Sequence, residues 1–257
     1  SSKHEYIPGF EWEAIPNNVF GVRYIHRSIG KVLQDIAPAP AVACDAGFVE
    51  ACSVDYVLTN PNSGIPTIPA VLGAAFEDPI HDYDAVEFTY ERRFLNNWMI
   101  NTSYRWSRLY GTYEGFFRDD NGQSDPGITS LYDFPTNDPS YTAIGGTEFG
   151  YQGNIQYLGA LGAGPLPLDR PNAFKFFGNY AFPFGLSLGV GYYATSGKPL
   201  TALAALPPYD NDSEIPLTPR GAGFETVDGF KTRTPWEYQF DLQGSYQFRM
   251  GGRSLTL

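Results

Sequence analysis

This chain of 257 residues is 42% hydrophobic and carries a formal net charge of −11 at pH 7. No run of about 18 or more apolar residues occurs in it, which excludes transmembrane helices. Its acidity argues against a nucleic-acid partner, because nucleic acids require a basic surface. Its 18 Tyr and 19 Phe are a high aromatic load for a chain of moderate hydrophobicity. That combination is typical of transmembrane β-barrels, which have a polar interior and aromatic girdles at both membrane interfaces.

Short links and long polar segments alternate along the chain. The short links are Pro16–Asn18, Leu95–Asn97, Pro183–Gly185 and Met250–Gly252. The long segments are about 37–82, 116–168 and 201–233. A transmembrane barrel has short periplasmic turns and long extracellular loops, whereas a soluble β-sandwich has no reason to keep its short turns at one end. The alternation therefore predicts that 1–257 is a segment of one transmembrane β-barrel domain with these three extracellular loops.

Between the links, apolar and polar residues alternate with the period of a two-faced β-strand. The apolar positions are Tyr6, Phe10, Trp12, Phe20, Val22, Tyr24, Val86, Phe88, Tyr90, Trp98, Ile100, Thr102, Tyr104, Trp106, Phe174, Phe176, Tyr180, Phe182, Leu186, Leu188, Val190, Tyr192, Trp236, Tyr238, Phe240, Leu242, Tyr246 and Phe248. This pattern predicts an antiparallel up-and-down barrel, present in part, with seven strands and the beginning of an eighth at 253–257. The polar face would meet the lumen, where we expect cross-strand pairs such as Glu91 with Arg105.

The acidity of the chain is concentrated in the long segments. They hold seventeen carboxylates against four Lys or Arg residues, whereas the predicted hairpins carry a small positive excess. If the three segments are loops on one side, the negative charge lies on one rim of the barrel. Two interpretations remain open, namely solubility and a role in binding a ligand or cations.

Two sets of residues in the long segments suggest local chemistry. Cys44 and Cys52 lie in one exposed loop, which in an oxidising compartment predicts a disulfide. Oxygen-bearing side chains alternate in the second segment at the spacing of a calcium loop, namely Asp119, Asn121, Gln123 and Asp125, with Asp133 nearby. A calcium loop also requires a bidentate acid at its twelfth position, where Ser130 stands. The alternative is a loop held by its own Asx turns.

Catalysis is not expected, since no nucleophile, base and acid are grouped anywhere in the chain. No other cofactor is indicated.

Several phrases resemble the C-terminal barrel region of Oar-like TonB-dependent outer-membrane receptors. The phrases are 83–89, 92–94, 97–98, 103–107, 111–115, 120–123, 169–175, 196–200 and 219–221. Among them, Asp169-Arg170-Pro171-Asn172 and Ser196-Gly197-Lys198-Pro199 are two of the longer ones. Their order and spacing make the set specific, and the resemblance covers nearly the whole chain from about residue 5.

The resemblance implies a plugged barrel of about 22 strands in the outer membrane of a Gram-negative bacterium. It also implies energy supplied through the TonB system, a ligand captured by the extracellular loops, and outer-membrane lipid around the barrel. Neither a plug nor a TonB box is recognised in 1–257, so we expect the chain to be part of a longer polypeptide.

Two other interpretations were weighed. The first is a self-contained eight-stranded structural or adhesive outer-membrane barrel without active transport, although 253–257 is too short to close it. The second is a secreted glycan-binding β-sandwich, which would have turns of mixed length at both ends.

Overall fold

The computed structural model describes residues 2–32, 34–36, 57–59, 79–113, 163–204, 215–216, 218–250 and 253–256. All regular structure within these ranges is β-strand, and the strands that pair in the main sheet are antiparallel. No helix in the described ranges is long and apolar enough to cross a membrane. The predicted all-β, antiparallel fold is therefore confirmed.

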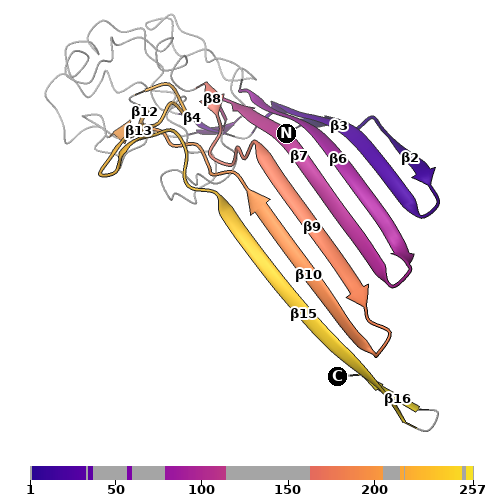
Figure 1. Cartoon of the computed structure of the whole chain (residues 1–257). Helices are drawn as coiled ribbons and strands as arrows, with labels where there is room; N and C mark the ends of the chain where they lie inside the picture. The colour runs from indigo at the N-terminus through magenta and orange to yellow at the C-terminus, as the bar shows by residue number, and fades with distance from the viewer. Residues whose placement is uncertain are drawn as a thin grey trace, which may run out of the picture.

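The main sheet is built from strands that follow one another in space as they do in sequence, in the order β1-β3-β6-β7-β9-β10-β15-β16 (Figure 1). Its members are β1 (Ser2–Tyr6), β2 (Gly9–Ile15), β3 (Asn18–Lys31), β6 (His81–Leu95), β7 (Trp98–Gly111), β8 (Gly164–Pro165), β9 (Asn172–Ala181), β10 (Leu186–Thr195), β15 (Glu237–Met250) and β16 (Arg253–Thr256). Small ladders join β4 (Gln34–Ile36) to β5 (Val57–Thr59), β11 (Leu203–Ala204) to β12 (Ile215–Pro216), and β13 (Phe224–Thr226) to β14 (Gly229–Lys231).

The first strand of the sheet is interrupted at 7–8, where the sequence pattern predicted a continuous strand. Pro8 has no backbone N–H, but its carbonyl accepts a hydrogen bond from the Tyr24 N–H (2.9 Å). The register is the same on both sides of the break, since Tyr6 faces His26 and Gly9 faces Arg23. Thus β1 and β2 are two parts of one strand, and Pro8 is tolerated on the β3 side because it takes part in the pairing through its carbonyl and not through an N–H.

The short turns follow from residues that accept a left-handed backbone. Asn17, Asn96, Asn97 and Gly185 all have positive φ, from 53° at Asn96 to 102° at Gly185. Two successive left-handed residues at 96–97 match the right-handed twist of the hairpin strands. The turn pairs Leu95 with Trp98, and a register shift between Arg92 and Leu95 then places Arg105 opposite Glu87. The expected pair of Glu91 with Arg105 is therefore wrong, because Glu91 faces Asn101.

Cross-strand register confirms the predicted separation of the two faces. One row across seven strands consists of Phe10, Val22, Phe88, Tyr104, Phe174, Ala194 and Tyr238. The neighbouring row on the opposite face consists of Glu11, Gly21, Thr89, Ser103, Lys175, Tyr193 and Gln239. Large side chains on the apolar face are widely exposed, reaching 69% at Leu242. A face this apolar requires surroundings other than water.

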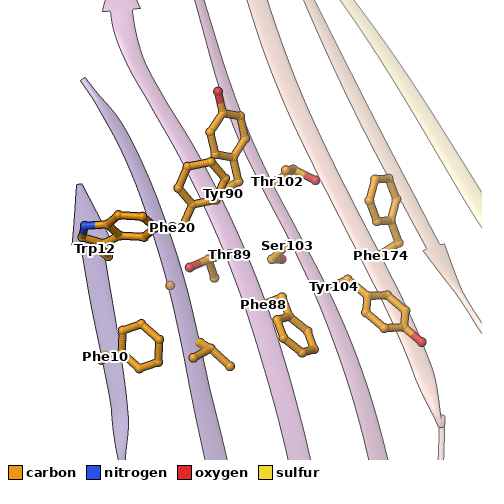
Figure 2. Close-up of a pocket in the computed structure, with 12 residues that line it drawn as sticks. Phe10, Trp12, Phe20, Phe88, Thr89, Tyr90, Thr102, Ser103, Tyr104 and Phe174 are labelled. Carbon is orange, nitrogen blue, oxygen red and sulfur yellow. The ribbon is translucent and has the colours of Figure 1, made fainter. Parts of the chain in front are cut away.

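The apolar face is uneven as well as exposed. A hollow of about 590 Å³ opens between the rings of Phe20 and Tyr90 and those of Phe88, Tyr104 and Phe174 (Figure 2). Phe20 and Tyr90 pack against each other with ring centroids 4.8 Å apart. Thr102 lies in the row of Phe20, Tyr90 and Phe176. Its side chain is much shorter than theirs, which leaves the space open.

The hairpins extend past a common row by different lengths, and the last one extends furthest. From Phe10, Phe88, Phe174 and Tyr238, which share that row, the strands continue to Ile15, Leu95, Ala181 and Met250 respectively. The same stagger is visible as a staircase of short turns in Figure 1. A stagger of this kind is the consequence of strands that tilt against the axis of a barrel.

Candidate functional site at the loop-side end of the sheet

The described parts of the long connections gather at the end of the sheet opposite the short turns (Figure 1). The strand β8 pairs with the last residues of β7, and Pro199 and Thr201 form bridges to Arg233 and Gly223. His81 and Asp82, expected in the first long loop, belong instead to β6. Most of the fully buried side chains lie at this end, including Val32, Thr112 and Leu166. We call the described residues 163–171, 196–204 and 218–236 the rim segments.

An ion pair with a buried carboxylate joins two of the rim segments. Asp169 is 2% exposed, and its Oδ2 accepts from Nη2 of Arg233 at 2.6 Å. Its Oδ1 accepts from the Leu109 N–H of β7, also at 2.6 Å. Arg233 further donates through Nη1 to the carbonyl oxygens of Asp169 and Gly197. A buried carboxylate is tolerated only when paired and hydrogen-bonded in this way, so the pair holds both segments on the end of β7.

A second ion pair continues the network onto β15. Nη2 of Arg170 donates to Oε1 of Glu237 at 2.6 Å, and Nη1 donates to the Ser196 carbonyl at 3.2 Å. Glu237 is the first residue of β15, on the loop side of the membrane-crossing part of that strand, since a crossing needs only about 9–11 residues. The hydrogen bond from Arg170, helped by the positive charge, holds the pKa of Glu237 below its ordinary value.

Three glycines allow the rim segments to pass close to the strand ends. A Cβ at Gly111 would lie 1.9 Å from the Ile80 carbonyl oxygen, and one at Gly197 would lie 1.7 Å from that of Thr234. At Gly164 the corresponding distance to the Arg220 oxygen is 2.3 Å. These separations are too short for any side chain, so glycine is required where backbone crosses backbone.

Below the rim, charged side chains line the polar face of the sheet. Arg23 donates to Glu87 at 2.5 Å, and the register places Arg105 on the other side of Glu87. In the adjacent row, the Lys175 ammonium lies 5.8 Å from the ring centroid of Tyr193. Alternating charges of this kind form a polar wall suited to water or to a polar ligand.

The residues predicted to carry local chemistry lie outside the part of the chain that the structure describes. They are Cys44, Cys52, Asp119, Asn121, Gln123, Asp125 and Asp133. Among the residues that are described, no group of three or more His, Cys, Asp or Glu is placed to hold a metal ion.

Sequence reasoning missed the two ion pairs of the rim. Asp169 and Arg170 stood out only as part of a phrase typical of a family, and nothing near Arg233 marked it as their partner. The useful signal was the position of an Asp-Arg pair directly before an aromatic strand, because charged residues at a strand end need partners from a neighbouring segment.

The up-and-down topology, the staggered turns, the exposed apolar face and the polar wall together define part of the wall of a transmembrane-type β-barrel. No protein-family model matches the chain, and no solved structure matches it. The chain is 30% identical over 259 residues to the TonB-dependent transporter Oar of Myxococcus xanthus. That match covers 99% of this chain and 20% of the relative, so the chain spans about a fifth of its length. The predicted resemblance to Oar-like TonB-dependent receptors is thereby confirmed.

Proposed function

We propose that this chain forms part of the barrel wall of an outer-membrane TonB-dependent transporter of a Gram-negative bacterium. The observation that carries the proposal is the pairing of a continuous, exposed apolar face with a charged polar face on one register-locked sheet. The similarity to a TonB-dependent transporter along nearly the whole chain supports it. The role is transport rather than catalysis.

In this proposal the apolar face contacts lipid and the polar wall faces the lumen of a plugged barrel of about 22 strands. The long segments 37–82, 116–168 and 201–233 are extracellular and capture the ligand on an acidic rim. Energy for its passage comes from the TonB system, which acts through parts of the protein other than this wall. The rim network of Asp169, Arg170, Arg233 and Glu237 supports the proposal because it orders the bases of two of these loops.

Two substitutions at opposite ends of the sheet test the orientation. Asp228 lies in a rim segment with a side chain 80% exposed, and Asn96 lies in an exposed short turn. In a protein with Cys44 and Cys52 replaced by serine, a membrane-impermeant maleimide should label Asp228→Cys in intact cells. Asn96→Cys should react only after the outer membrane is permeabilised. Labelling in the reverse order would overturn the proposed orientation.

The mass of the polypeptide in its native membrane distinguishes the two barrel interpretations. A mass several-fold above 28.4 kDa, with peptides from both sides of 1–257, supports the transporter. A mass of 28.4 kDa would instead support a small structural or adhesive barrel.

We also propose a disulfide between Cys44 and Cys52 and a calcium ion bound by Asp119, Asn121, Gln123, Asp125 and Asp133. Thiol alkylation before and after reduction tests the disulfide, because only the reduced protein should take up two labels. Calorimetric titration with calcium, repeated with Asp119→Asn, tests the ion site.

A further inference from the structure

Arg92 lies on the apolar face of the sheet, near the short turns. Register places Arg92 in a row with Asn18, Ile100 and Gly178, two residues along β6 from Tyr90 on the same face. No described carboxylate forms an ion pair with Arg92, and its Nε is buried without a hydrogen-bond partner among the described residues. Its Nη atoms make only long contacts, 3.5 Å to Oδ1 of Asn18 and 3.4 Å to the Leu95 carbonyl. A guanidinium has five N–H donors, so one N–H on each Nη atom of Arg92 remains without a described acceptor.

Arg92 is held at the level of the short turns. Its Cζ lies 3.8 Å from the ring centroid of Trp98, the first residue of β7, and its own strand ends at Leu95. A cation on the lipid face of a barrel costs about 2–4 kcal/mol at the bilayer midplane and close to nothing near an interface. Tryptophan favours the same interface. The pair therefore occupies the depth at which lipid phosphates lie.

A hollow in the apolar face begins beside the same tryptophan. It measures about 440 Å³, and its lining includes Trp98, Ile100, Phe176, Tyr180 and Leu188. The hollow exists because Gly178 presents no side chain between Ile100 and Val190 in its row. Trp98 thus contacts the arginine and borders the hollow, which brings a cation and an apolar groove together at one interface.

We propose that Arg92, Trp98 and the hollow at Gly178 bind one phospholipid of the periplasmic leaflet, with its phosphate on the guanidinium and an acyl chain in the hollow. The inference rests on the proposed function, because that function sets the membrane orientation of the sheet. Charge complementarity selects the occupant, since an arginine beside an apolar groove suits an anionic headgroup joined to a hydrocarbon chain. Arg92 on β6 and the hollow at Gly178 on β9 lie two strands apart in the sheet, within reach of one lipid molecule.

The test measures binding of dioleoyl phosphatidylglycerol to the full-length protein, as its cell makes it, by native mass spectrometry. Arg92→Gln should weaken binding of one lipid by about tenfold, the loss expected for a charged hydrogen bond. Arg93→Gln is the matched control, because Arg93 is the next residue, points to the polar face and is paired with Glu91 at 3.9 Å. Equal binding by Arg92→Gln and the wild type would overturn the inference.

Two further measurements do not depend on that variant. Gly178→Ala should also weaken binding, because its Cβ would enter the hollow 3.1 Å from the Phe176 ring. Gly189→Ala on the polar face, where the nearest atom is 3.4 Å away, should have no effect. The wild-type protein should prefer phosphatidylglycerol to dioleoylglycerol, which has no phosphate. Equal affinity for the two lipids would overturn the role of the guanidinium.

The remaining outcomes distinguish failure of this inference from failure of the proposed function. A dimer that dissociates in Arg92→Gln would assign the face to a second copy of the chain and overturn the lipid. Insertion of the wild type into bilayers with the expected loop accessibility, but without lipid selectivity, would overturn this inference alone. Failure of the wild type to insert would overturn both.

Discussion

Nη2 of Arg233 donates to Oδ2 of Asp169 across 2.6 Å, and this bond joins two rim segments that are 64 residues apart in sequence. Asp169 is buried and also accepts from the backbone of β7. Loops whose ends are fixed on the sheet can present a ligand-binding surface with less loss of conformational entropy than loops whose ends are mobile. The pair therefore fixes the positions at which two of the long connections, 116–168 and 201–233, join the sheet.

The first prediction is that removing either partner of this pair destabilises the rim. Arg233→Gln should lower the free energy of unfolding by about 3 kcal/mol, because Asp169 stays buried without its compensating charge. Asp169→Asn should lower it by less, because the Arg233 side chain is 30% exposed and water can solvate its charge. The double variant should lose less than the sum of the two, since the interaction is shared. Urea unfolding in lipid vesicles measures the unfolding free energies of the wild type, the two single variants and the double variant, which together form a double-mutant cycle.

The control for that cycle is the exposed pair of Asp228 with Lys231, at 3.1 Å. Asp228→Asn should change stability by less than about 1 kcal/mol, because water screens an exposed pair. Additive losses at Asp169 and Arg233 would show that the two side chains do not act together.

The second prediction concerns backbone crossing at the rim. Gly197→Ala should lower stability by about 1–3 kcal/mol, because its Cβ would lie 1.7 Å from the Thr234 oxygen and the two segments must separate. Gly30→Ala is a suitable control, since its nearest neighbour, Oγ of Ser2, would lie at an ordinary 3.5 Å. Thermal unfolding of both variants checks the difference, and equal melting temperatures would contradict the close approach.

The third prediction tests which face contacts lipid. Leu242 is 69% exposed on the apolar face, and Gln243 is its exposed neighbour on the polar face. Leu242→Lys should reduce the free energy of folding into bilayers by about 2 kcal/mol, whereas Gln243→Lys should have little effect. The yield of folded protein in vesicles at several urea concentrations measures both, and equal yields would reject a lipid-facing assignment for Leu242.

The fourth prediction is an acid dependence of the Arg170–Glu237 pair. Because the folded pKa of Glu237 is lowered, its stabilising contribution is complete above the ordinary Glu pKa of about 4.3. It is lost as the pH falls through the lowered value. Proteolysis of the segment 197–236 should therefore accelerate at acidic pH, and Glu237→Gln should show less of this acceleration. An identical acid response in both proteins would rule out a contribution from the pair.

Much of the wall could be predicted from the sequence because a period of two is a local signal. Each strand from Val86 to Phe248 places its apolar residues on one side whatever its neighbours do. The short turns were equally visible, since asparagine and glycine at 96–97 and 185 accept positive φ. The break at Pro8 was not predicted, because an unchanged register conceals it in the pattern.

Pairing across strands was decided by the tertiary structure. The expected contact of Glu91 with Arg105 failed because the turn at 96–97 and the register shift between Arg92 and Leu95 together set which residues lie opposite each other, and a local pattern does not report this. The alternation along β6 already puts Arg92 on the face of Tyr90, but its stacking on Trp98 depends on the pairing of β6 with β7.

The alternation of side chains along each strand and the residues that permit tight turns are local properties, so the chain carries them in its sequence. Three features depend on segments brought together from different strands or loops. They are the ion pair of Asp169 with Arg233, the stacking of Arg92 on Trp98 and the hollow at Gly178. Such contacts form only when the register of the sheet and the approach of the rim segments are set. Their physical origin is burial and close packing, which no stretch of sequence expresses alone.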